Sequence, residues 1–133
     1  MTSLQSLISL VSAWADQDPE SDYRDASLQL LERLEACDKL ALEAARELFG
    51  SRLAFGTAGI RGPMRGGPNG MNRLVISQTT AGIARYLLVK SPSSKSATHH
   101  VAIGFDGRHN SETFARDTAE VLSGHGINAT LLP

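Results

Sequence analysis

The sequence is poor in residues that several protein classes need. Its 133 residues include a single cysteine, Cys37. One thiol excludes an intrachain disulfide and disfavours a thiolate metal site. Aromatic residues make up 5% of the chain and the net charge is −1. This composition disfavours both a base-stacking platform and electrostatic attraction to nucleic acid, so we expect no nucleic-acid partner.

Long hydrophobic runs are also missing. No stretch approaches the roughly 20 apolar residues that a membrane span needs. The first 15 residues lack a basic start and are interrupted by Gln5, Ser6, Ser9 and Ser12, so they do not read as a signal peptide. We therefore expect no membrane partner and a cytoplasmic location.

Familiar catalytic and metal-binding patterns are absent as well. The four histidines have no cysteine, glutamate or third histidine at a ligand spacing, which leaves no metal signature. No nucleophile elbow or oxyanion loop accompanies any serine. The sequence therefore predicts neither a metal site nor a catalytic residue of its own.

The first 50 residues carry helical periodicity. Apolar residues recur at helical spacing over residues 4–15, after Ser3, which can cap the helix. Further helices are predicted over about residues 25–36 and 39–49, the latter ended by Gly50 in a left-handed conformation. The residues expected to face the core from these two helices are Leu28, Leu31, Leu34, Leu40, Leu42, Ala45 and Phe49.

A glycine-rich segment and another helix follow. Residues 56–70 contain six glycines and two prolines, so we expect a shaped loop, not a helix or regular strand. Ser77 can cap a helix over about residues 78–88. Its buried face is expected to comprise Ile83, Ala84, Leu87 and Leu88. Residues 91–100 are small and polar, as in a solvated connector.

The last third predicts a βαβ unit. Residues 101–105 form a short apolar run typical of a parallel strand. Ser111 can cap a helix that extends to about Ser123, and residues 127–132 predict the next strand. The inner stripe of that helix is expected to comprise Phe114, Thr118, Val121 and Leu122. Such a unit crosses over right-handed in nearly all cases.

Together these elements predict an α/β protein in two parts. Residues 1–50 form a helical N-terminal extension, and residues 51–133 form a domain with a mixed or parallel sheet. The turn after the first predicted strand carries Asp106 and Arg108. Open α/β sheets place their ligands at the carboxyl ends of their strands.

Two clusters could bind phosphate, and each has a structural alternative. Glycines let a backbone approach an anion, and Arg61 and Arg65 add guanidinium forks to the glycine-rich segment. That segment matches neither the Walker nor the dinucleotide-binding spacing, so an ordinary tight loop remains an alternative. The Asp106–Arg108 pair could equally hold a turn, with the arginine neutralising the aspartate.

The order of motifs resembles the first domain of the α-D-phosphohexomutases, the phosphoglucomutase and phosphomannomutase group that includes phosphopentomutase-like enzymes. The resemblance covers roughly Leu53–Pro133. It rests on FGTAGIRG (Phe55–Gly62), GPNGMNRLVI, GIARYL, IGFDGRHNSETFARD and GINATLLP, in that order. These motifs are specific in combination and weak singly. The fold implied is an incomplete first domain of this family.

The resemblance also implies an activity and a set of binding residues. Family members move phosphate between hydroxyls of one sugar through an active-site phosphoserine, and an Asp-Gly-Asp-x-Asp loop binds Mg²⁺. Thr57, Gly59 and Arg61 fall on the N-terminal active-site loop, where they and Arg108 are expected to bind phosphate. Neither the Thr-Ala-Ser-His-Asn-Pro serine loop nor the Mg²⁺ loop occurs in this sequence, so no catalytic residue or metal ligand is assigned.

Two interpretations follow. In the first, the chain is an N-terminal fragment of an isomerase of carbohydrate metabolism, an intramolecular phosphotransferase that interconverts sugar 1-phosphates and 6- or 5-phosphates. This fragment is expected to end before the serine loop and to be inactive alone, and sugar phosphates are its partners through the complete enzyme. In the second, the chain is a stand-alone, non-catalytic α/β module that binds an anion or a protein. The downstream nucleotide sequence would separate the two.

Overall fold

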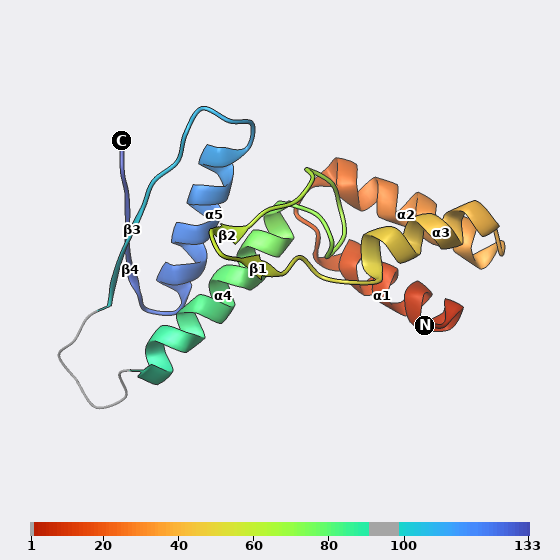
Figure 1. Cartoon of the computed structure of the whole chain (residues 1–133), viewed down its shortest axis with the longest axis horizontal. Coiled ribbons are helices and arrows are strands. Elements are labelled where there is room, and N and C mark those ends of the chain that lie inside the picture. Colours follow the sequence, from red (N-terminus) through yellow and green to blue (C-terminus); the bar gives the residue numbers. More distant parts are fainter. Residues whose placement is uncertain (1, 91–98) are drawn as a thin grey trace. The chain divides into compact units, whose positions relative to one another are not determined.

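The protein is α/β, as the sequence predicts. The computed structural model describes residues 2–90 and 99–133 (Figure 1). In chain order the elements are α1 (Leu4–Gln17), α2 (Ser21–Glu35), α3 (Lys39–Phe49), β1 (Phe55–Gly56), β2 (Gly59–Ile60), α4 (Arg73–Lys90), β3 (His100–Ile103), α5 (Ser111–Gly124) and β4 (Asn128–Leu131). They divide into two compact units, Met1–Val75 and Ile76–Pro133. Most of the connector predicted over residues 91–100 lies outside the described residues.

The core of the first unit is helical. Ser3 caps α1 as predicted, because its hydroxyl accepts a hydrogen bond from the Ser6 N–H. The rings of Trp14 and Phe49 meet edge to face, with centroids 6.3 Å apart, a geometry that aromatic pairs favour. The buried apolar residues of this core are Leu7, Val11, Trp14, Leu30, Leu34, Ala41, Ala45, Phe49, Leu74 and Val75.

Two predicted core positions are wrong. Leu28 is 43% exposed and Leu40 is 69% exposed. The buried stripe of α2 runs instead through Ser27, Leu30 and Leu34, and α2 begins at Ser21, four residues before the predicted start. Several leucines in a short helix permit more than one apolar stripe, and packing against α1 selects among them.

A short turn connects α2 to α3, and its left-handed residue is not the predicted glycine. Gly50 has a right-handed backbone with φ of −73°, so the predicted left-handed stop is wrong. The left-handed residue is Cys37, with φ of 58°. The Cys37 and Asp38 N–H groups donate to the carbonyls of Leu34 and Arg33, which is the pattern of a Schellman cap.

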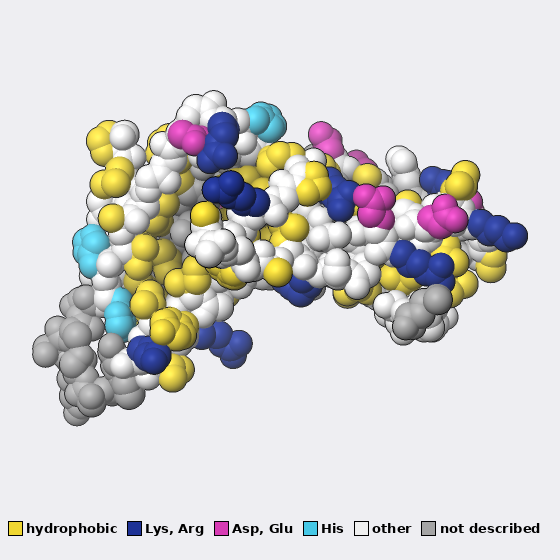
Figure 2. Space-filling model, viewed as in Figure 1, with side chains coloured by type: hydrophobic (Ala, Val, Ile, Leu, Met, Phe, Trp, Pro, Cys, Tyr) yellow, Lys and Arg dark blue, Asp and Glu magenta, His cyan; other side chains and the backbone are white. Residues whose placement is uncertain are grey.

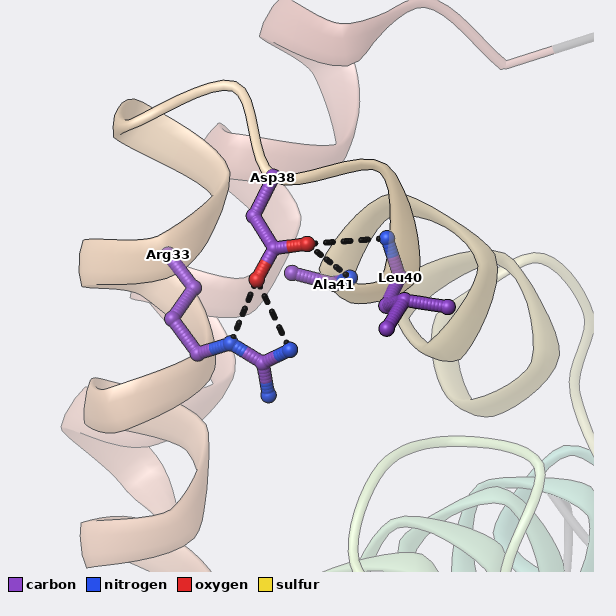
Figure 3. A network of polar contacts seen from close by, with 4 residues as sticks. All are labelled: Arg33, Asp38, Leu40 and Ala41. Carbon is purple, nitrogen blue, oxygen red and sulfur yellow. Dashed lines mark hydrogen bonds and ion pairs between the residues drawn. The ribbon is translucent and has the colours of Figure 1, made fainter.

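Asp38 then serves both helices. Figure 3 shows its carboxylate between the Arg33 guanidinium of α2 and the first turn of α3. One oxygen accepts from Arg33 at 2.8 Å, and the other accepts from the Leu40 and Ala41 N–H groups. The Arg33 hydrogen bond, with further support from these backbone bonds, lowers the pKa of Asp38.

The predicted start and cap of α4 are wrong. The helix begins at Arg73, so Ser77 lies inside it and does not cap it. The first turn is capped by Asn72, whose Oδ1 accepts from the Val75 N–H at 3.0 Å. Of the predicted buried face, Ala84 is buried, whereas Ile83 and Leu88 are 43% and 42% exposed.

The second unit contains the predicted βαβ arrangement. β3 and β4 pair in parallel, with Val101 opposite Ala129 and Ile103 opposite Leu131. In the chain, α5 lies between the two strands, and Leu122 is buried with Ile127. β3 is shorter than predicted, since it ends before residues 104 and 105.

Two details of α5 differ from the expectation. Phe114 is only half-buried, while Ala115 and Leu122 are buried. The N-cap is Asn110, in a left-handed conformation and without a side-chain capping bond. The Ser111 hydroxyl accepts instead from the Asp106 N–H at 3.2 Å, so this serine supports the preceding turn.

Among the described residues, no helix is long and apolar enough to cross a bilayer.

Asp18 is a buried carboxyl group between α1 and α2. Its residue exposure is 3%. One oxygen accepts from the Glu20 N–H at 3.0 Å. Among the described residues, the other oxygen and the Trp14 indole N–H are buried without a hydrogen-bond partner, although the nearby indole helps to hold the pKa of the carboxyl down. Burial raises the pKa of Asp18 above its ordinary value, and the Glu20 bond offsets part of that rise.

We expect Cys37→Gly to stabilise the chain by about 1 kcal/mol. A left-handed backbone costs a residue with a Cβ about 1–2 kcal/mol, and glycine avoids this cost while losing more chain entropy on folding. The measurement is the free energy of unfolding in urea. Cys37→Ala is the matched control, because alanine removes the thiol but keeps the Cβ. Equal stability of the two variants would contradict this account of the cap.

We also expect Asp18 to make stability fall as pH rises above about 4. Because its native pKa is raised, the folded state holds a proton that the unfolded state has released, so raising the pH through this window favours unfolding. Asp18→Asn should remove that contribution while its Oδ1 still accepts from Glu20. The stability of the wild type relative to this variant, measured in urea from pH 4 to 7, should therefore decrease. A constant difference would refute the assignment.

Candidate functional site

The candidate site is built on a short hairpin in the glycine-rich segment. β1 and β2 pair antiparallel, with Gly56 opposite Gly59 and a two-residue turn, Thr57–Ala58, between them. These two-residue strands are a feature that the loop prediction missed. Gly59 has φ of +91°, a conformation that L-residues adopt only with strain. A glycine at this position allows the hairpin to close.

The hairpin encloses an open pocket of about 310 Å³. It is lined by Ala54, Gly56, Thr57, Ala58, Gly59 and Arg61. The structure thus brings three of the predicted phosphate-binding residues together: Thr57, Gly59 and Arg61. Small side chains and glycines leave the backbone approachable, and the threonine hydroxyl and the guanidinium supply hydrogen-bond donors.

Of the described residues, Arg61 is the only cationic one that lines this pocket. Its side chain is exposed, and within the part of the chain that the structure describes it has no hydrogen bond or ion pair. A guanidinium has five N–H donors in a planar fork that suits phosphate oxygens. Arg61 can therefore meet an anion without breaking an existing contact.

Arg65, the second arginine of the segment, has a structural role. Its Nη1 pairs with the Glu47 carboxylate at 2.7 Å, and its Nε donates to the Asn69 carbonyl at 3.2 Å. These contacts join the glycine-rich segment to α3. Arg65 is therefore bonded within the fold, whereas Arg61 lines the pocket.

Arg108 lies in the second unit, on the turn after β3. Asp106 accepts from its backbone N–H at 3.1 Å and from its Nε at 2.8 Å. The backbone bond is the main cause that lowers the pKa of Asp106, and the Arg108 side chain adds to it. The pair therefore holds the turn. Arg108 remains 85% exposed, so its guanidinium also faces solvent.

On the face that Figure 2 shows, charge is not concentrated in one patch. Figure 2 shows basic and acidic side chains interspersed on the face in view. Among the described residues, no group of three or more histidine, cysteine, aspartate or glutamate side chains could hold a metal ion.

The sequence analysis assigned no role to Asn72, which lies two residues after the glycine-rich segment. Asn72 is fully buried and bonds to several carbonyls of the glycine-rich loop. The available signal was its position directly before an apolar helical run, where asparagine is a favoured cap. Ser77, five residues later, is also a favoured cap residue, and the sequence analysis predicts the start of the helix there instead.

Comparison with known proteins now identifies the family. Residues 52–133 match the model of the phosphoglucomutase/phosphomannomutase family, alpha/beta/alpha domain I. The matched range is more than half of the chain. The chain therefore belongs to this family, the α-D-phosphohexomutases, as the order of motifs suggested.

Three curated relatives illustrate the similarity. A probable phosphomannomutase of Haemophilus influenzae is 50% identical over 66 residues, covering 48% of this chain and 12% of the relative. A probable phosphoribomutase of Schizosaccharomyces pombe is 38% identical over 118 residues, covering 89% and 19%. A phosphoglucomutase of Staphylococcus aureus is 41% identical over 86 residues, covering 65% and 15%.

The chain thus spans less than a fifth of the length of each of these relatives. The match to the S. pombe protein extends over 118 residues, more than the 82 that the family model covers. No solved structure matches the chain.

Proposed function

We propose that this chain is the N-terminal part of an intramolecular phosphotransferase that interconverts sugar 1-phosphates and 6- or 5-phosphates. Residues 51–133 would belong to the first catalytic domain and residues 1–50 to a helical extension. Family membership supports the reaction class. The single observation that supports a role for this chain in it is the hairpin pocket, where Arg61 has no hydrogen bond or ion pair with any described residue.

The pocket's residues suit a phosphate group in complementary ways. Arg61 supplies a fixed positive charge and paired N–H donors, and Thr57 adds a hydroxyl. Gly59 leaves the backbone uncovered, so N–H groups of the hairpin can approach the oxygens. Charge stabilisation of this kind accounts for much of the catalysis of phosphoryl transfer. Arg108, exposed on its turn, is proposed as a further phosphate contact.

The covalent carrier and the metal site must come from other sequence. The 133 residues contain no Thr-Ala-Ser-His-Asn-Pro motif and no Asp-Gly-Asp loop. In family members Mg²⁺ supplies charge neutralisation on the transferred phosphoryl group. This chain contributes binding and orientation. We propose a role in cytoplasmic carbohydrate metabolism, with a sugar phosphate as substrate.

We expect Arg61→Ala to weaken phosphate binding by about tenfold or more, since a charge-assisted hydrogen bond contributes about 1.5–3 kcal/mol. The chain can be titrated with glucose 1-phosphate while the NMR amide signals of residues 57–61 are followed. In a chimera that joins this chain to the remaining domains of a family enzyme, turnover should fall about 100-fold or more. Arg61→Lys should retain part of both.

Arg85→Ala is the matched control for this experiment. Arg85 is an exposed arginine of α4, so its removal makes the same change in net charge without touching the hairpin. Equal losses for the two alanine variants would mean that only net charge matters. Unchanged binding and turnover in Arg61→Ala would remove this residue from the proposed site.

We expect the 133-residue chain alone to show no mutase activity, because it has no serine loop to carry the phosphoryl group. The assay combines the purified chain with glucose 1-phosphate, glucose 1,6-bisphosphate and Mg²⁺, and measures glucose 6-phosphate. A preparation purified in parallel without the chain controls for host mutase. Turnover that copurifies with the chain would contradict the expectation.

A further inference from the structure

Asn72 has more hydrogen bonds than any role in capping requires. Its side chain is fully buried, between the glycine-rich loop and the first turn of α4. Oδ1 accepts from the Val75 N–H at 3.0 Å. Nδ2 lies 2.9 Å from the Arg65 carbonyl, 2.8 Å from the Gly67 carbonyl and 3.3 Å from the Gly70 carbonyl. The oxygen of the amide therefore caps α4, while its nitrogen binds the glycine-rich loop.

The loop is folded closely around this amide. A Cβ at Gly70 would collide with the Arg65 carbonyl, and a Cβ at Gly67 would come 2.7 Å from the Leu48 carbonyl. Gly67 also has φ of +82°. Both glycines are thus required for the tight path that brings three carbonyls to one side chain. An amide N–H₂ is the neutral side-chain group that can donate to several carbonyls at once.

Two contacts connect this loop to the backbone beside Arg61. The Met71 N–H, next to Asn72, donates to the Pro63 carbonyl at 2.8 Å. The Leu53 N–H donates to the Pro68 carbonyl at 3.0 Å. The Leu53 side chain in turn packs so tightly on Gly62 that a Cβ there would lie 2.7 Å from it.

We propose that Asn72 is a positioning residue for Arg61: its amide N–H₂ holds the 65–70 loop, and that loop holds the base of the phosphate-binding hairpin. Gly62 and Pro63, the residues that follow Arg61 in the chain, are the ones held. The hairpin itself has only two residue pairs, too few for independent stability. Ile60 of the hairpin also packs on the helical core, while the backbone that directly follows Arg61 is held by the loop. The expected effect on phosphate binding rests on the proposed function. The support that Asn72 gives to the hairpin can be measured whether or not the hairpin binds phosphate.

Asn72→Asp separates the two roles of the side chain. A carboxylate oxygen still accepts from the Val75 N–H, and a negative charge at a helix N-terminus is favourable. All three donations to carbonyls are lost. We expect exchange of the Leu53 and Met71 amide protons to accelerate about tenfold or more, because buried carbonyls left without donors destabilise the loop. The backbone order parameters of residues 59–62 should fall.

Two controls isolate the effect. Asn128→Asp makes the same substitution on an exposed residue of β4. Leu122→Ala removes buried side-chain volume in α5, in the separate core cluster that contains Ala84 and Ile127, and so lowers stability without touching the loop. If Asn72→Asp does not fold, Asn72→Ser replaces it, since serine also caps helices and has one donor in place of two. Neither control should change the order parameters at residues 59–62.

Phosphate binding completes the test. With inorganic phosphate as the probe, the dissociation constant of Asn72→Asp should rise about fivefold or more relative to Asn128→Asp. Unchanged amide exchange and order parameters in a folded Asn72→Asp variant would overturn the proposal. If the wild type binds phosphate, an unchanged phosphate affinity of this variant would also overturn it. If the wild type binds no phosphate, the proposed function fails, while exchange and order parameters still decide whether Asn72 supports the hairpin.

Discussion

The structure of the first unit depends on one buried amide. A side chain without solvent must find partners for all its polar atoms, since an unpaired buried donor or acceptor costs about 1–3 kcal/mol. Asn72 meets this condition by joining the end of the glycine-rich loop to the start of α4. The glycines around it are consequences of that arrangement, because side chains would occupy the space that the carbonyls need.

Arg65 and Arg61 differ in whether their side chains are bonded within the fold. Arg65 is joined to Glu47 and to the loop backbone, so its charge is used within the fold. Arg61, four residues earlier, lines the hairpin pocket with its charge available. Both belong to one glycine-rich segment, and a motif alone does not distinguish them. Asp38 and Asp18 show a similar contrast: one is bonded on both oxygens, and the other keeps one oxygen unpaired.

The proposed phosphate-binding role would give these local features a common purpose. The hairpin is a place where an anion can approach backbone and guanidinium together, and the parallel β3–β4 pair presents a second turn with Arg108. Rigid support for exposed binding groups is a general requirement of phosphoryl transfer, where positioning and charge do most of the work. The loop, the cap of α4 and the packing of Leu53 on Gly62 provide such support here.

The sequence by itself determined the class of the protein, the existence of its five helices and the parallel βαβ unit. Those features follow from local periodicity, caps and the order of motifs, as Ser3 and the 101–132 region show. Tertiary structure alone decided which leucines of α2 and α3 are buried, why Cys37 and not Gly50 is left-handed, and that the Asn72 side chain binds the loop carbonyls. It also decided which arginine faces the pocket. These outcomes depend on partners distant in the chain, such as Glu47 for Arg65, and a local pattern does not contain its partners.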